Sequence, residues 1–65
     1  MNNTGTRIER LHAVIDRTGL SRSSIYALIA KGEFIEPVKL SSRAIGFIAS
    51  EVDAWIVQRA NLRSR

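Results

Sequence analysis

Two short amphipathic segments, separated by a very short break, are the feature that most constrains this chain. The break is residues 19–21 (GLS), and on each side of it apolar residues recur at the i, i+3, i+4 spacing of a helix face. These positions are Leu11, Val14 and Ile15 before the break and Ile25, Leu28 and Ile29 after it. The pattern predicts helices over residues 12–18 and 22–31, joined as a helix-turn-helix unit.

Local end signals support both helices. Gly19 tolerates the left-handed backbone conformation that ends helices, so it is predicted to stop the first one. Ser21 is a favourable N-cap for the second, because its hydroxyl can accept a hydrogen bond from a free backbone N–H one turn later. Lys31 suits the negative end of that helix, and Gly32 is predicted to end it.

The sequence pattern changes after the second helix. Pro37 excludes a helix there, and two alternating or β-branched stretches, residues 38–40 and 44–48, flank the polar residues 41–43. This arrangement predicts a β-hairpin with residues 41–43 at its tip. Residues 7–11 also alternate polar and apolar, so they are predicted to form a short strand or an extended lead-in to the first helix.

A third helix is predicted from Ser50 to Leu62. Ser50 is expected to cap it, and Asp53 to complete a capping-box-like pair. One stripe of this helix carries Val52, Trp55, Ile56 and Arg59. The three apolar members are expected to face the core, and Arg59 is expected to lay its aliphatic stem over the same surface.

Two short helices, a hairpin and a closing helix predict a mainly α fold with a small β-hairpin, the winged helix-turn-helix. With 65 residues there is room for one domain, predicted over residues 7–62, between a flexible tail at 1–6 and a basic tail at 63–65. The predicted core is Leu11, Val14, Ile15, Leu20, Ile25, Leu28, Ile29, Phe34, Val38, Leu40, Phe47, Val52, Trp55 and Ile56.

Charge and composition narrow the kinds of function. The chain has 10 Lys+Arg against 6 Asp+Glu, a formal charge of +4, and every basic residue except Lys31 and Lys39 is arginine. The planar guanidinium group of arginine can donate two parallel hydrogen bonds to a phosphate or a guanine edge. The excess of arginine over acidic residues therefore favours a nucleic-acid partner. The lack of Cys and the single His argue against disulfides and against thiolate or His-rich metal sites.

Membrane and catalytic signals are missing from the sequence. No stretch approaches the apolar length that crosses a membrane and no export signal is evident, which predicts a cytoplasmic protein with no membrane partner. The acidic residues show neither metal-ligand spacing nor a partner base, and the four glycines form no phosphate-binding loop. We therefore expect a protein that is not an enzyme, with no catalytic residue, cofactor, metal or small-molecule substrate.

The exposed side of the second helix is the candidate DNA-reading surface. Residues at the N-terminal end of a recognition helix meet base edges, which places Arg22 and Ser23 in the major groove of double-stranded DNA. Tyr26 is expected to place its hydroxyl on a phosphate. The hairpin tip is expected to contact backbone or minor groove at a second, separated point. The predicted DNA-binding residues are Arg22, Ser23, Ser24, Tyr26, Ala27, Lys31, Lys39, Ser41, Ser42 and Arg43.

Plainer roles are open for several of these residues. Arg22 and Arg43 are also compatible with solvated surface, and Ala27 with an idle solvent face. Tyr26 is equally compatible with a partly buried core position that keeps only its hydroxyl wet. Trp55, spaced with its apolar neighbours on the third helix, is expected to be a core residue and not a stacking platform.

Taken in order, these residues resemble the AlpA family of prophage regulators. The resemblance rests on residues 18–26 (TGLSRSSIY), Gly32, Phe34, residues 37–40 (PVKL), Arg43 and residues 51–55 (EVDAW). It implies an excisionase-like or MerR-like winged helix-turn-helix, in which residues 21–26 begin the recognition helix and Arg43 belongs to the wing. It also implies a role in activating integrase genes or in excising integrated elements.

The chain departs from the family pattern at three positions. Members often carry a basic residue where this chain has Ala27, a tryptophan where it has Phe47, and a proline where it has Ile35. The difference at Ala27 bears on the preferred DNA site, whereas Phe47 is expected to keep the packing of the second strand.

Three functions follow as hypotheses. The first is a sequence-specific DNA-binding transcriptional regulator of a prophage or genomic island, acting at an integrase promoter. Since one monomer has a small footprint, its copies are expected to self-associate or bind cooperatively on repeated sites. The second is an excisionase that bends attachment-site DNA. The third is a protein-binding adaptor or inhibitor, which has no need for basic Arg22 and Arg43.

Overall fold

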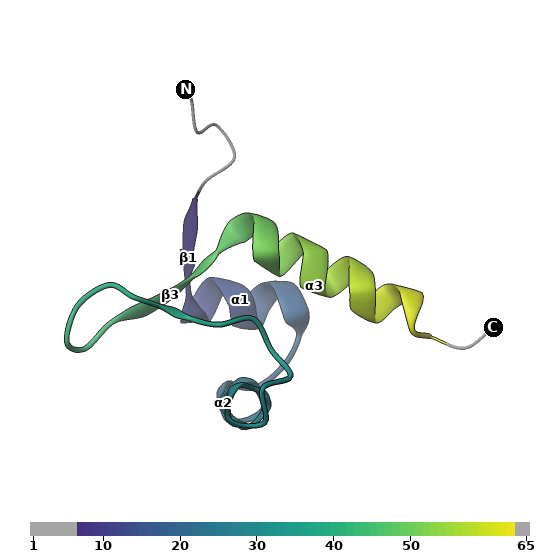
Figure 1. The fold of residues 1–65 in the computed structure, drawn as a ribbon, viewed down its shortest axis with the longest axis horizontal. Helices are drawn as coiled ribbons and strands as arrows, with labels where there is room; N and C mark the ends of the chain where they lie inside the picture. Colours follow the sequence, from purple (N-terminus) through teal and green to yellow (C-terminus); the bar gives the residue numbers. More distant parts are fainter. Residues whose placement is uncertain (1–6, 64–65) are drawn as a thin grey trace.

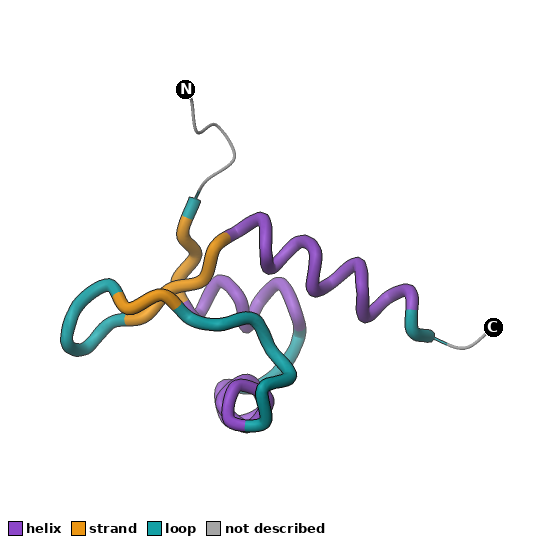
Figure 2. Tube along the Cα trace, in the orientation of Figure 1, coloured by secondary structure: helices purple, strands orange, loops and turns teal. Residues whose placement is uncertain are grey.

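The computed structural model describes residues 7–63, which form three helices and a three-stranded antiparallel sheet. The elements are β1 (Ile8–Arg10), α1 (Leu11–Thr18), α2 (Arg22–Ala30), β2 (Val38–Lys39), β3 (Ile45–Ile48) and α3 (Ala49–Asn61). Figures 1 and 2 show the hairpin of β2 and β3 extending from one side of the helices as a wing. The predicted winged helix-turn-helix is confirmed. The predicted tail at 1–6 and residues 64–65 lie outside the described residues.

The central strand of the sheet is β3, with β1 on one side and β2 on the other. Gly46 pairs with Arg10 of β1 and with Val38 of β2. Residues 7–11 therefore contribute a strand, one of the two alternatives predicted for them. Gly46 is buried where the two pairings meet, and a Cβ added there would overlap the Ile8 side chain. The sheet packs this closely because residue 46 has no side chain.

The turn between α1 and α2 has the chemistry predicted from the sequence. Gly19 adopts the left-handed backbone conformation (φ 76°), and its N–H donates to the Ile15 carbonyl at 2.8 Å. Ser21 Oγ accepts the Ser24 N–H at 3.1 Å and so caps α2. Gly32, just beyond the C-terminal end of α2, adopts the same left-handed backbone conformation (φ 71°). The ends of both helices are thus set by local chemistry.

The start of α3 differs from the prediction. The helix begins at Ala49 directly after β3, with Ile48 as its N-cap and no side-chain cap. The predicted cap at Ser50 and the capping-box role of Asp53 are wrong, because the Ala49 N–H donates instead to the Arg7 carbonyl at 2.8 Å. Strand pairing thus replaces side-chain capping here. Elsewhere the helix bounds differ from the predicted ones by one residue, and no helix within residues 7–63 is long and apolar enough to cross a membrane.

The core lies between the helices and the inner face of β3. Its buried hydrophobic members are Leu11, Val14, Ile25, Phe47, Ala49 and Val52. Around them pack the partly buried Ile15, Leu20, Ile29, Phe34, Ile35, Ile45 and Ile56. Most of the predicted core is confirmed, but Leu40 is 42% exposed because it sits near the tip of the wing.

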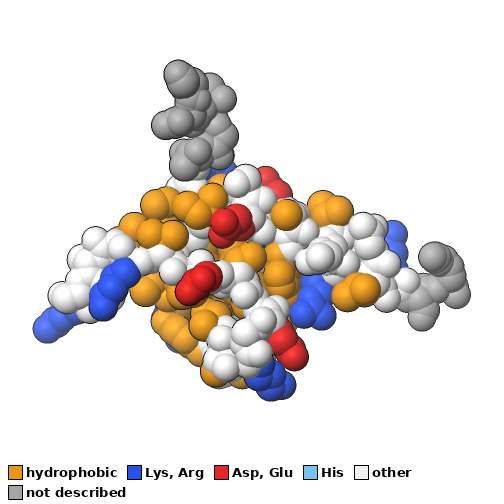
Figure 3. All heavy atoms as spheres, in the orientation of Figure 1, with side chains coloured by type: hydrophobic (Ala, Val, Ile, Leu, Met, Phe, Trp, Pro, Cys, Tyr) orange, Lys and Arg blue, Asp and Glu red, His pale blue; other side chains and the backbone are white. Residues whose placement is uncertain are grey.

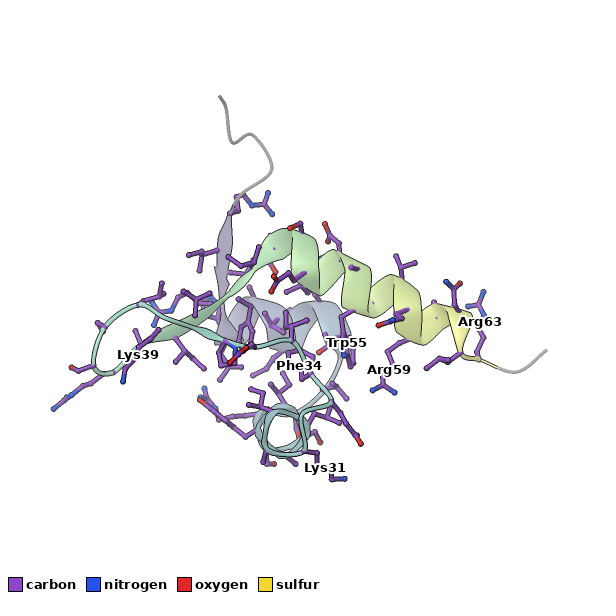
Figure 4. The ribbon with its side chains drawn as sticks, viewed as in Figure 1. Lys31, Phe34, Lys39, Trp55, Arg59 and Arg63 are labelled. Atoms are coloured by element: carbon purple, nitrogen blue, oxygen red, sulfur yellow. The ribbon has the colours of Figure 1, made fainter. Side chains whose placement is uncertain are left out.

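An aromatic cluster connects the segment after α2 to α3 (Figure 4). The Phe34 ring meets Phe47 edge-on, with centroids 5.7 Å apart, and meets Trp55 at 4.7 Å. Trp55 Nε1 donates to the Glu33 carbonyl at 3.2 Å, and Arg59 Cζ lies 4.8 Å from the Trp55 ring centroid. The predicted placement of Arg59 over the apolar stripe is confirmed, and Trp55 packs as a half-buried part of the fold.

Arg17 of α1 joins three elements on another part of the surface. Its Nη1 donates to both carboxylate oxygens of Glu9 in β1, at 2.9 and 2.7 Å, and its Nη2 pairs with Asp53 of α3. Hydrogen bonds to Asp53 and then Glu9 raise the pKa of the Arg17 guanidinium above its ordinary value. One side chain therefore links β1, α1 and α3, and Asp53 serves this link in place of a helix cap.

Candidate nucleic-acid interface

One face of α2 is buried and the other is exposed. Ile25 is fully buried in the core cluster, and Ile29 packs against it. On the other side of the helix, Ser23, Ala27 and Ala30 are exposed. The inward orientation of the apolar stripe, on which the DNA-reading interpretation depends, is confirmed. The small exposed residues leave the backbone of α2 accessible to a bulky partner.

A shallow pocket joins α2 to the wing. Arg22 and Tyr26 lie one helical turn apart and line this pocket, whose volume is about 170 Å³. Arg43 of the wing lines it as well. All three residues are exposed, and Tyr26, at 45%, lies outside the core cluster, so the alternative of a partly buried core position for it is wrong. The helix and the wing, predicted as two separated contact points, meet at one basic surface.

Hydrogen bonds within the wing tip determine its shape. The N–H groups of Leu40 and Ser41 both donate to the Ala44 carbonyl, at 2.8 and 3.2 Å, and the Arg43 N–H donates to Ser41 Oγ at 3.3 Å. All three residues of the tip are exposed, and Ser41 also accepts a hydrogen bond within the turn. Figure 3 shows blue Lys and Arg side chains at the outer end of the wing. This tip offers positive charge on a defined loop.

The other seven predicted contact residues do not line the pocket, and three of them, Lys31, Lys39 and Ser24, lie or act elsewhere. Lys31 follows the opposite end of α2, about 13 Å along the helix axis from Arg22 at 1.5 Å per residue. Lys39 is exposed on the wing, well separated from Lys31 in Figure 4. Ser24 is held by Ser21, which accepts its N–H and donates to its Oγ at 3.0 Å. Ser24 thus has a structural role that the sequence prediction did not include.

The sequence did not predict two polar pocket residues, Arg10 and His12, as part of the site. Both line the pocket with Arg22 and Arg43. The pairing of Arg10 with Gly46 across β1 and β3 brings residues 10–12 to the base of the wing. The local sequence shows only a polar–apolar alternation there, which does not reveal the strand that β1 joins. Their place in the interface is a consequence of long-range strand pairing.

The surface charges are distributed unevenly. Away from the pocket, Arg17 holds the carboxylates of Glu9 and Asp53. Among residues 7–63, no carboxylate lines the pocket and none forms an ion pair with its three arginines. The positive charge of this surface is therefore available to an anionic partner, which it also attracts over a distance.

These features define a structural class: a winged helix-turn-helix protein whose recognition helix and wing share one basic surface. The family model of the prophage CP4-57 regulatory protein (AlpA) matches residues 7–60, and the chain belongs to the AlpA family. The resemblance drawn from the sequence motifs is confirmed.

Two relatives match over nearly the whole chain. Uncharacterized protein ORF88 of Enterobacteria phage P4 is 44% identical over 62 residues, which covers 95% of this chain and 70% of the relative. The DNA-binding transcriptional activator AlpA of Escherichia coli (strain K12) is 34% identical over 67 residues, which covers 94% of this chain and 96% of the relative. No solved structure matches the chain.

Proposed function

We propose that this protein is a sequence-specific DNA-binding transcriptional regulator of a prophage or genomic island, acting at an integrase promoter. Support comes from its AlpA-family membership and from the relative named as a DNA-binding transcriptional activator. The main structural observation is the pocket shared by Arg22, Tyr26 and Arg43. It joins the N-terminal end of the recognition helix to the wing, as simultaneous contact with one duplex requires. The role is regulatory and non-enzymatic.

In this proposal, α2 enters the major groove with its N-terminal end foremost. Arg22 pairs with a guanine edge through both arms of its guanidinium, and Ser23 bonds a base or a phosphate. Ala27, exposed one turn later, lets the helix backbone approach the bases closely. The wing rests on the neighbouring sugar-phosphate backbone, where Arg43 and Lys39 supply positive charge.

One monomer covers only a short DNA site. Its longest dimension is 39 Å, equivalent to about eleven base pairs at 3.4 Å per pair. An interface of this size limits the affinity and specificity of a single copy. A copy bound at one repeat raises the effective concentration of a second copy at the adjacent repeat when the two copies contact each other. We therefore propose cooperative binding on repeated sites.

Footprinting on the DNA that flanks the protein's own gene tests the proposal. Protection of discrete sites is expected for the wild type. The variant Arg22→Ala/Arg43→Ala is expected to lose this protection while its circular dichroism spectrum stays native. Arg63→Ala, which removes a charge from the far end of the molecule in Figure 4, is the control. A folded double variant with unchanged DNA affinity would contradict the proposal and favour the protein-binding adaptor.

An excisionase would use the same surface but would change the shape of the DNA. An excisionase is expected to bend its site and to bind in arrays. A circular-permutation gel assay tests for bending, since mobility depends on the position of the site only when the complex is bent. An unbent complex would count against the excisionase role.

A further inference from the structure

Basic and polar side chains from three elements converge on the pocket beside α2. Arg10 and His12 come from the junction of β1 and α1, Arg22 comes from α2, and Arg43 comes from the wing. Of these four residues, the proposed function assigns Arg22 to base edges and Arg43 to the sugar-phosphate backbone. The presence of Arg10 and His12 in the same small space calls for a further explanation.

The size and charge of the pocket suit a single phosphate group. Its volume is about 170 Å³, whereas pockets that enclose a drug-sized ligand begin at about 300 Å³. No carboxylate from the described residues lines it. Guanidinium groups donate to phosphate oxygens through short, charge-assisted hydrogen bonds. Tyr26 also lines the pocket, and its hydroxyl is a neutral donor.

We propose that this pocket holds one backbone phosphate of the bound duplex, gripped mainly by Arg10 and Arg43 with His12 as an additional donor. This inference rests on the proposed DNA-binding function and adds Arg10 and His12 to the contact residues. A phosphate held between α2 and the wing sets the depth and register of the recognition helix, which leaves Arg22 to read base edges.

The fold connects the two arms of this clamp through the central strand. Arg10 lies on β1 and pairs with Gly46 of β3. Arg43 lies in the turn that leads into β3, two residues before the strand begins. The sheet therefore places Arg10 at the base of the wing whose tip carries Arg43.

Binding to a short fluorescent duplex of mixed sequence, measured over a range of salt concentrations, tests the clamp. Arg10→Gln is expected to weaken binding about tenfold and to lower the magnitude of the slope of log K against log salt by about one. The loss should be equal on mixed and footprinted sequences, because a phosphate contact carries no base information. The matched control Arg63→Gln is expected to change affinity by less than about twofold.

The outcomes separate the clamp from the proposed function. Equal effects of Arg10→Gln and Arg63→Gln, with wild-type protein still bound to DNA, would overturn the clamp and leave the regulator intact. A wild type that bound no DNA would overturn both. Arg10 is exposed, so the variant is expected to keep its native circular dichroism spectrum.

Two further measurements locate the phosphate. Neutral methylphosphonates placed singly along the duplex should include one position that weakens the wild type but has no effect on Arg10→Gln. Parallel losses in both proteins at every position would overturn the clamp.

The second measurement needs only the wild type. The chemical shift of the Arg10 Nε–H group is expected to change when duplex DNA is added and to stay unchanged when inorganic phosphate alone is added. A shift with inorganic phosphate and none with duplex would assign the pocket to a free anion and overturn the proposal.

Discussion

Trp55 Nε1 donates to the carbonyl of Glu33 at 3.2 Å, and this bond ties α3 to the segment that leaves the recognition helix. Phe34, the next residue, packs edge-on against the same indole at 4.7 Å. The recognition helix is thus anchored at both ends, because the Ser21 cap holds its start. Its orientation therefore depends on contacts distant from the residues proposed to contact DNA.

Replacing Trp55 with Phe tests this anchor. The variant keeps an aromatic ring but loses the indole donor and part of the buried area, so the free energy of unfolding is expected to fall by about 1–2 kcal/mol. Urea unfolding followed by far-UV circular dichroism measures the change. Val57→Ala on the same helix, at a 58% exposed position, is the control, expected to lose less than about 0.5 kcal/mol. Equal losses in the two variants would show that the Trp55 contacts do not stabilise the fold.

Gly46→Ala tests the close packing of the sheet. The added Cβ overlaps the Ile8 side chain and lies 3.3 Å from the Glu9 carbonyl, so a loss of about 1–3 kcal/mol in unfolding free energy is expected. Combining it with Ile8→Ala removes the larger overlap and should restore part of the loss. A double-mutant cycle by thermal unfolding measures this coupling. Purely additive effects would contradict the packing described at Gly46.

A pair of serine variants on α2 separates folding from DNA binding. Ser21→Ala removes the N-cap and is expected to cost about 1 kcal/mol of stability. Ser23→Ala removes no hydrogen bond within the described structure, so its stability should stay within about 0.5 kcal/mol of the wild type. Its affinity for the footprinted site should fall about tenfold if Ser23 contacts a base. An unchanged affinity for Ser23→Ala would remove Ser23 from the interface.

Arg17→Gln tests the link between β1, α1 and α3. The raised pKa of Arg17 means that its stabilising effect is complete below its ordinary pKa and is lost only as pH rises through the higher, folded value. The difference in melting temperature between wild type and variant is therefore expected to be a few degrees and constant between about pH 6 and pH 9. Thermal unfolding at several pH values measures it. A difference that vanished within this range would contradict the link.

The parts of the fold predicted from sequence are those determined by neighbouring residues. Gly19 and Ser21 predict the turn between α1 and α2 because the left-handed stop and the hydroxyl cap act within one helical turn. The inward face of α2 follows from helix geometry in the same way. Arg59 over Trp55 was predictable because four residues on a helix bring side chains together.

The remaining features depend on contacts between distant segments. Ser50 has the chemistry of a cap, but α3 begins at Ala49 because the Arg7 carbonyl, brought close by strand pairing, accepts its N–H. Leu40 alternates like a buried strand residue, yet it lies beside the turn at the tip of the wing and is 42% exposed. Arg10 joins the candidate interface only through its pairing with Gly46. No local pattern in the sequence contains this information.

The salt dependence of DNA binding tests the central claim most directly. If α2 and the wing together neutralise about four to six phosphates, the slope of log K against log salt should be about −4 to −5 for the wild type on its footprinted site. The Arg22→Ala/Arg43→Ala variant should show a weaker affinity and a shallower slope. A wild-type affinity that did not change with salt would contradict the assignment of this basic surface to duplex DNA.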